Sequence, residues 1–227
     1  MSDLWTLEDV DRDGAIQDAA EHVDPNTRAA FLRKAGIGAG TVIGGGALMG
    51  ALPSLASAAS VPASDIAILN FALTLEYLEA EFYRQAKANN VGNGQQDLTA
   101  FINVVAKHEA AHVAFLKGAL GRKAVAKPAF DFKDAVTSQA KFAATAQVLE
   151  DTGVQAYLGQ AGNIKSKKIL AAAGSILPVE ARHAAWIRDI NGGFKGGRPL
   201  PAPSAFQGAR TKAQILAKVK ATGFIVS

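Results

Sequence analysis

The sequence predicts an all-α protein: a four-helix bundle of two antiparallel hairpins joined by a long crossover, followed by a short C-terminal helix. After Pro62, apolar residues recur three and four positions apart over long stretches, as they do on one face of a helix. Alternating runs rich in β-branched residues, which would indicate strands, do not occur in this part of the sequence. The connections within each hairpin are short, which makes the paired helices antiparallel neighbours.

The first hairpin consists of two predicted helices. One runs from Ser64, a candidate N-cap, to about Ala88. The segment Asn89–Gly94 then breaks the pattern, because asparagine and glycine favour turns. The second helix is expected from Asp97, which can also cap a helix, to about Ala119.

The second hairpin repeats this arrangement. Its first helix is predicted from about Asp134 to Gln160 and its second from about Ser166 to Ile190. The three residues 191–193, an asparagine and two glycines, are expected to end the latter helix.

The remaining connections complete the predicted topology. About twelve extended residues span roughly 40 Å, so residues 121–132 can run along a whole 25-residue helix, which is about 37 Å long. Pro178 is expected to kink its helix and not to break it. Residues 194–210 contain three prolines and are expected to be irregular, and a short helix from Thr211 to Ala221 follows.

Four regions follow from these patterns: an acidic tail, an apolar segment, the bundle, and a Pro/Gly-rich tail that carries the last helix, at residues 1–26, 27–60, 64–190 and 191–227. The first region has eight acidic side chains against Arg12 alone, a net charge of −7, which leaves +11 for the rest of a chain whose total is +4.

The apolar segment is similar to an export signal. It has a basic start, an uncharged middle within residues 35–64, and an Ala-x-Ala sequence at residues 56–58. It resembles a twin-arginine signal, although Ala29 follows Arg28 where the second arginine belongs. This predicts export to the periplasm or cell envelope. A membrane anchor, if the segment is uncleaved, and a glycine-rich linker in a cytoplasmic protein are the alternatives.

Composition narrows the chemistry. The chain has no cysteine, which excludes disulfides, thiolate zinc sites and iron–sulfur clusters and leaves carboxylate, imidazole and hydroxyl groups. The lysines are scattered without an accompanying stripe of aromatic and arginine residues, so nucleic acid is not an expected partner.

The phrase Glu-x-x-His occurs in the second and fourth predicted helices, as Glu109 with His112 and as Glu180 with His183. Residues three apart share a helix face, so each carboxylate and imidazole can converge on one point. With 8 Glu and 4 His in 227 residues, chance predicts only about 0.14 such pairs. His108, beside Glu109, is expected to be a solvated or helix-packing residue.

A second repeated phrase occupies the other two helices, where Glu76 precedes Tyr83 and Glu150 precedes Tyr157 by seven residues. Seven residues make about two helical turns, so each pair also shares a face. The chain therefore reads as two copies of one helical hairpin, related by an internal pseudo-twofold axis.

These carboxylates fall on the apolar stripes of their helices, where ionised groups cost several kcal/mol each without compensation. Two divalent ions would balance Glu76, Glu109, Glu150 and Glu180. Carboxylate and imidazole donors without thiolate suit iron or manganese, with zinc as a further occupant. Glu79 lies about 60° round the helix from Glu76 and is an alternative donor to it.

With these motifs the chain, over about residues 64–190, resembles the ferritin-like superfamily, and within it the bacterial ferritin-like domain proteins related to desiccation-associated proteins of plants. The resemblance rests on the two Glu-x-x-His pairs and on the segments LNFALTLEYLEAEFY (69–83) and LEDTGVQAY (149–157). All six ligand positions of the superfamily are occupied, and the same ligand set defines di-iron and di-manganese carboxylate bundles in general.

The resemblance implies specific roles. Glu109 and Glu180 would be bridging carboxylates, His112 and His183 terminal imidazoles, and Glu76 and Glu150 terminal carboxylates. Tyr83 and Tyr157 would lie behind the ligands and hydrogen-bond to one or pass an electron. The residues predicted to take part in catalysis are therefore Glu109, Glu180, Tyr83 and Tyr157.

The function predicted at this point is a non-haem di-iron or iron/manganese protein that binds Fe(II) and reacts with dioxygen or peroxide, with iron oxidation or detoxification under stress as the outcome. The competing hypothesis is a stress- or desiccation-associated scaffold with a structural or vacant metal site. A homo-oligomer is compatible with either hypothesis, and a membrane would be contacted only through the apolar segment.

Overall fold

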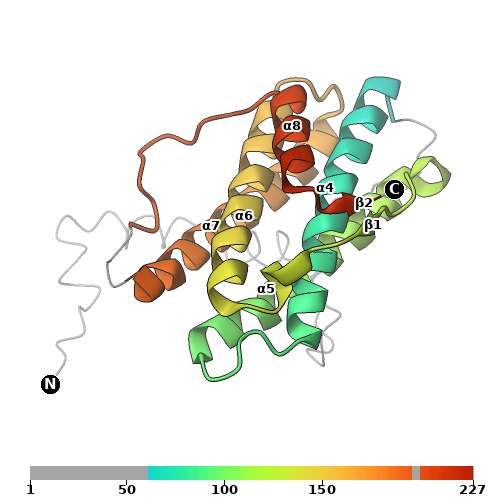
Figure 1. The fold of residues 1–227 in the computed structure, drawn as a ribbon. Coiled ribbons are helices and arrows are strands. Elements are labelled where there is room, and N and C mark those ends of the chain that lie inside the picture. Colours follow the sequence, from blue (N-terminus) through green and yellow to red (C-terminus); the bar gives the residue numbers. More distant parts are fainter. Residues whose placement is uncertain (1–60, 196–199, 227) are drawn as a thin grey trace, which may run out of the picture. The chain divides into compact units, whose positions relative to one another are not determined.

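The computed structural model describes residues 61–195 and 200–226. In these ranges the chain forms five α-helices, labelled as in Figure 1: α4 (Ala63–Ala88), α5 (Gln96–Leu120), α6 (Gln139–Ala161), α7 (Lys167–Lys195) and α8 (Lys212–Thr222). The four long helices form the bundle and α8 packs against α6, which confirms the predicted fold class. The acidic tail and the signal-like segment lie outside the described residues. None of the described helices has the length and hydropathy needed to span a membrane.

Two hairpins build the bundle. α4 packs along α5, and α6 packs along α7, while α4 also meets α6 and α5 meets α7 across the bundle. Aromatic side chains join these elements at one end: the ring of Phe82 on α4 stacks on Phe142 of α6 at 4.9 Å and meets Phe132 edge-on at 5.3 Å. All three are fully buried, and each contributes about 1.5–3 kcal/mol by leaving water.

The crossover between the hairpins runs along α4 in the direction of that helix. Asn70 donates to the carbonyl of Lys123, farther along Glu81 pairs with Lys127 at 2.6 Å, and near the helix end Asn89 donates to the carbonyl of Val136 at 2.8 Å. The long connection predicted from the loop length is therefore present. It starts α6 beside the C-terminal end of α4, so these two helices are antiparallel.

The ends of two helices differ from the prediction. Residues Lys133–Val136 form a separate 3₁₀ turn, so α6 begins at Gln139 and not near Asp134. α7 continues past Ile190 to Lys195, because the buried amide of Asn191 donates to the carbonyl of Ala143 and the side chain of Gln147 on α6. That tertiary contact outweighs the tendency of asparagine to end a helix. α7 also runs unbroken through Pro178.

The N-caps were only partly predicted. α4 and α5 begin one residue before Ser64 and Asp97, so both residues lie in a first turn and neither caps its helix. Thr211 does cap α8, in a capping box with Gln214. The expected boundary of that helix is confirmed to within a residue.

The C-terminal segment fastens onto the hairpins. Strand β2 (Ile225–Val226) pairs antiparallel with strand β1 (Ala129–Phe130) of the crossover, a small sheet that the sequence did not predict. The backbone of Arg210 donates to Gln155 of α6, and its carbonyl would lie only 1.9 Å from a Cβ at position 159. Gly159 is therefore required for this backbone contact.

Asp65 ties the start of α4 to the loop between α6 and α7. Its buried carboxylate accepts from the backbone N–H groups of Lys165 (3.0 Å) and Ser166 (2.8 Å). Burial alone would raise the pKa of Asp65, but these hydrogen bonds outweigh burial and lower that pKa.

Asp65→Asn should lower the free energy of unfolding by about 1–3 kcal/mol, because it leaves a buried N–H without its charged acceptor. Denaturant unfolding monitored by circular dichroism measures this change. Asp97→Asn, an exposed position in the first turn of α5, is the matched control and should change stability by less than about 0.5 kcal/mol. Equal midpoints for the two variants would contradict the assigned role of Asp65.

Candidate metal centre

The long helices bring all six predicted donors together in the interior. Glu76 comes from α4, Glu109 and His112 from α5, Glu150 from α6, and Glu180 and His183 from α7. The four carboxylates are at most 1% exposed, whereas the side chain of His112, at 12%, lies nearest to solvent.

The donors form two compact groups, each with ligand atoms within 4.8 Å of one another: Glu76, Glu109, His112 and Glu180 make the first group, and Glu109, Glu150, Glu180 and His183 make the second. Glu109 and Glu180 belong to both. Glu79 is buried beside the two groups but belongs to neither. Of the two alternative donors on α4, the first group therefore contains Glu76 and not Glu79.

Each group centres on an imidazole Nδ1. In the first, Nδ1 of His112 lies 3.2 Å from Glu76, 3.2 Å from Glu109 Oε2 and 3.0 Å from Glu180 Oε1. In the second, Nδ1 of His183 lies 3.1 Å from Glu109 Oε1 and 3.2 Å from Glu150. Glu109 thus turns one oxygen to each group, which is the arrangement that a carboxylate spanning two adjacent ions needs.

The two tyrosines cross the bundle to hold the outer carboxylates. Tyr83 of α4 donates to Glu150 of α6, and Tyr157 of α6 donates to Glu76 of α4 at 2.5 Å. Burial, together with the acceptor carboxylates, holds the pKa of both phenols well above the usual range, so they remain protonated donors. Each tyrosine therefore orients a carboxylate that begins on the facing helix.

The carboxylates stand in a strongly perturbed electrostatic environment. Burial raises the pKa of Glu76 to about 7 and also raises that of Glu150, and burial together with Glu109 holds the pKa of Glu180 well above its usual range. Burial would do the same to Glu109, but its close contacts with His112 and His183 outweigh burial and lower that pKa.

The pKa values of the two imidazoles are raised, whereas burial alone lowers the pKa of a histidine. Burial disfavours the charged form of His183, but Glu109 and Glu150 outweigh it and raise the pKa to about 10. The same balance, with Glu76 as the largest opposing charge, raises the pKa of His112. In the absence of a cation, the centre therefore retains protons at neutral pH.

Unpartnered atoms indicate that protons alone do not satisfy this site. Five buried atoms have no hydrogen bond among the described residues: Glu109 Oε1, Glu150 Oε2, Glu180 Oε1, Glu180 Oε2 and His183 Nδ1. No lysine or arginine of the described ranges pairs with any of the four carboxylates. Unsatisfied buried carboxylate oxygens are costly, and all five atoms are of the kinds that bind metal ions, so the donor set fits two cations.

Comparison with known proteins agrees with this geometry. A family model described as a ferritin-like domain matches residues 64–193, more than half of the chain. The chain belongs to the ferritin-like family. No curated protein matches it. The superfamily assignment made from the sequence motifs is thereby confirmed.

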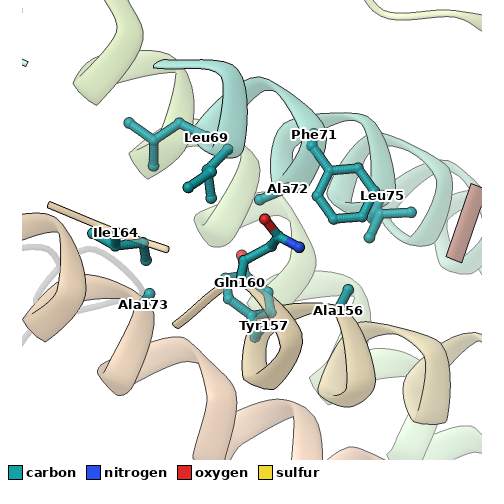
Figure 2. A pocket seen from close by; sticks show the side chains of 10 residues that line it. Leu69, Phe71, Ala72, Leu75, Ala156, Tyr157, Gln160, Ile164 and Ala173 are labelled. Atoms are coloured by element: carbon teal, nitrogen blue, oxygen red, sulfur yellow. The ribbon is translucent and has the colours of Figure 1, made fainter. Parts of the chain in front are cut away.

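In this ferritin-like bundle, Tyr157 also lines an apolar pocket. Figure 2 shows Tyr157 and Gln160 facing Leu69 and Ala72 across the pocket. The pocket has space for about 20 Å³, roughly one water-sized molecule. None of the six donors lines it. The donors thus lie outside the pocket lining, and Tyr157 contacts both, since its ring lines the pocket and its hydroxyl donates to Glu76.

His108 is a neighbour of the centre that the sequence interpretation missed. Its ring is half-buried and lies nearly parallel to that of His183, at an interplanar angle of 19° with centroids 5.1 Å apart, and its Nδ1 lies 2.8 Å from His183 Nε2. A hydrogen bond at Nε2 fixes the ring so that Nδ1 points to the carboxylates. The signal in the sequence was the spacing of four between His108 and His112, which places both on one helix face.

Metal binding should release protons and tighten as the pH rises. The raised pKa values of Glu76 (about 7) and His183 (about 10) mean that a metal ion displaces protons from the free centre over this range. Each proton released strengthens binding about tenfold per pH unit. Calorimetric titration with Mn(II) at pH 6.5 and 7.5, in buffers of different ionisation enthalpy, counts these protons. Binding with no proton release would contradict the predicted protonation.

His108→Ala should weaken one of two metal-binding steps by about 10–100-fold, because His183 loses the partner that orients it. Titration with Co(II), followed by visible absorbance, resolves the steps. Lys107→Ala, an exposed neighbour on α5, should bind as the parent does. If the two variants bound Co(II) equally well, His108 would have no orienting role.

Proposed function

We propose that the donor cluster binds two metal ions, iron above all, with manganese or zinc as alternative occupants, and that the protein oxidises Fe(II) with dioxygen or peroxide. One observation carries the proposal: four buried carboxylates and two imidazoles form two groups that share Glu109 and Glu180, and no lysine or arginine of the described residues pairs with the carboxylates. Purely structural carboxylates in a bundle would be expected to pair with arginine or lysine.

The donors and the two tyrosines have different roles in the proposed centre. Glu109 and Glu180 hold both positions at a short separation, while Glu76 with His112 and Glu150 with His183 complete one position each. Two adjacent iron ions, when bound, supply one electron each to the oxidant and act as Lewis acids. Tyr83 and Tyr157 keep the outer carboxylates oriented through their retained protons.

The surroundings of the centre also suit a redox site. The ring of Tyr83 packs edge-on against Phe101 and Phe142, both fully buried, so water is excluded behind Glu150. The side of the centre nearest to solvent is at His112. We infer that Fe(II) and the protons exchanged with it pass on that side.

The cellular setting is a further part of the proposal. The segments at residues 69–83 and 149–157, which resemble desiccation-associated proteins, support a role in stress, and the signal-like residues 27–60 support export. In this view the protein lowers the concentration of free Fe(II) in the cell envelope. A non-catalytic stress scaffold with a structural metal is the competing function, and the experiment below separates the two.

Protein loaded anaerobically with ferrous iron should bind two irons per chain and, on mixing with aerated buffer, develop the near-ultraviolet absorbance of oxygen-bridged ferric iron. Stopped-flow absorbance with iron analysis of the desalted protein measures both. Glu109→Ala combined with His112→Ala removes a shared carboxylate and an imidazole, and should lose both binding and absorbance.

The control is Glu81→Gln, which removes a mostly buried carboxylate of the same bundle that pairs with the exposed Arg84 and Lys127 and not with the donors. This variant should react as the parent does. If two irons bind but stay ferrous after the addition of dioxygen and after the addition of peroxide, the oxidase function would be refuted and the scaffold would be favoured.

A further inference from the structure

Glu79 is a buried carboxylate for which the six-donor description has no use. It lies on α4 one turn after Glu76 and is 3% exposed. In the described ranges it makes no hydrogen bond and no ion pair, although Glu81, two residues on, pairs with both Arg84 and Lys127. Burial without a partner is costly for a carboxylate, so its position needs an explanation.

The explanation begins at the equivalent position in the other hairpin. The offset from Glu76 to Glu150 is 74 residues, since 150 − 76 = 74, and the same offset takes Glu79 to Gly153. A Cβ built at Gly153 would lie 3.3 Å from Glu79 Oε1 and 3.3 Å from Glu180 Oε2. The glycine thus leaves room for an oxygen of Glu79 and an oxygen of Glu180, both of which face the same point of α6.

The orientation of Glu180 shows which group Glu79 faces. Glu180 Oε1 lies 3.0 Å from His112, in the first group, and Oε2 is the oxygen that faces Gly153, as Glu79 Oε1 does. Both oxygens of Glu180 are buried, and neither makes a well-oriented hydrogen bond with the described residues. Gly153 also lies one turn after Glu150 on α6, so Glu79 approaches the centre from the side of the second group.

Charge adds an independent argument. The charge of two divalent ions balances the charge of the four carboxylates in the two groups. Glu79 adds a fifth carboxylate. A position with an additional carboxylate favours the harder cation, because carboxylate oxygen suits manganese whereas imidazole suits zinc.

We propose that Glu79 is a seventh donor of the centre, serving the position formed by Glu109, Glu150, Glu180 and His183, so that the two metal positions are chemically unequal. The position with Glu79 binds Mn(II) the more tightly of the two. This inference rests on the proposed dinuclear centre but not on its reaction with oxygen.

The test is a titration of the metal-free protein with Mn(II), in which electron paramagnetic resonance measures the free ion. The parent should bind two Mn(II) in two distinguishable steps. Glu79→Gln should weaken the tighter step by about tenfold or more and leave the weaker step unchanged. Glu76→Gln, which removes a donor of the first group alone, should weaken the weaker step, and Glu81→Gln should change neither.

A parallel titration with Zn(II) examines the choice of metal. Glu79→Gln should cost less in Zn(II) affinity than in Mn(II) affinity, because zinc depends more on the imidazoles. A loss of equal size for both ions would overturn the preference for the harder cation.

Folding is checked by thermal unfolding of the metal-free variants, where Glu79→Gln should be at least as stable as the parent, since it removes a buried carboxyl. If that variant fails to fold, Glu79→Asp, which keeps the charge but shortens its reach, should still weaken the tighter step. Unchanged Mn(II) binding by the folded variant, or two equal steps in the parent, would overturn the inference. A parent that binds two unequal Mn(II) ions but does not oxidise Fe(II) would refute the proposed function and leave this inference standing.

Discussion

The structure depends on the cost of holding four ionisable carboxyl groups in an interior where water cannot reach them. Desolvation and mutual repulsion raise the pKa values of Glu76, Glu150 and Glu180, and only close contact with two imidazoles keeps Glu109 ionised. Such an arrangement is stable when cations or protons fill it. The neighbouring features follow from this constraint, since tyrosine hydroxyls orient the outer carboxylates and an aromatic core excludes water at one end.

The donor set was predictable because helical geometry fixes it locally. Glu-x-x-His places two donors on one helix face whatever surrounds the helix. The separation of seven residues likewise places Glu76 and Tyr83 on one face. What the sequence could not supply was the partner across the bundle. Each tyrosine serves the carboxylate of the opposite hairpin and not the one on its own helix, and this pairing depends on how α4 and α6 pack.

The same reasoning explains the errors at the helix ends and at His108. Asn191 and its glycines are local stop signals, but a buried amide contact with α6 outweighs them and α7 continues. His108 adjoins a donor in sequence, yet its partner His183 is 75 residues away. It departs from the internal repeat, as Glu79 does, since the offset of 71 between Glu109 and Glu180 places Val179 opposite His108. The repeat predicts where donors fall, and its exceptions show where the two halves differ.

Neither hairpin holds a complete set of ligands. The first group takes Glu180 from the second hairpin, and the second group takes Glu109 from the first. Bound ions would therefore add cross-links between two halves of the chain that are also joined by the crossover, by side-chain packing and by hydrogen bonds such as those of Tyr83 and Tyr157. A ligand present at a thousand times its dissociation constant adds about 4 kcal/mol to the folded state. The stability of the bundle would then depend on the supply of metal, and a shortage of metal would loosen the fold itself.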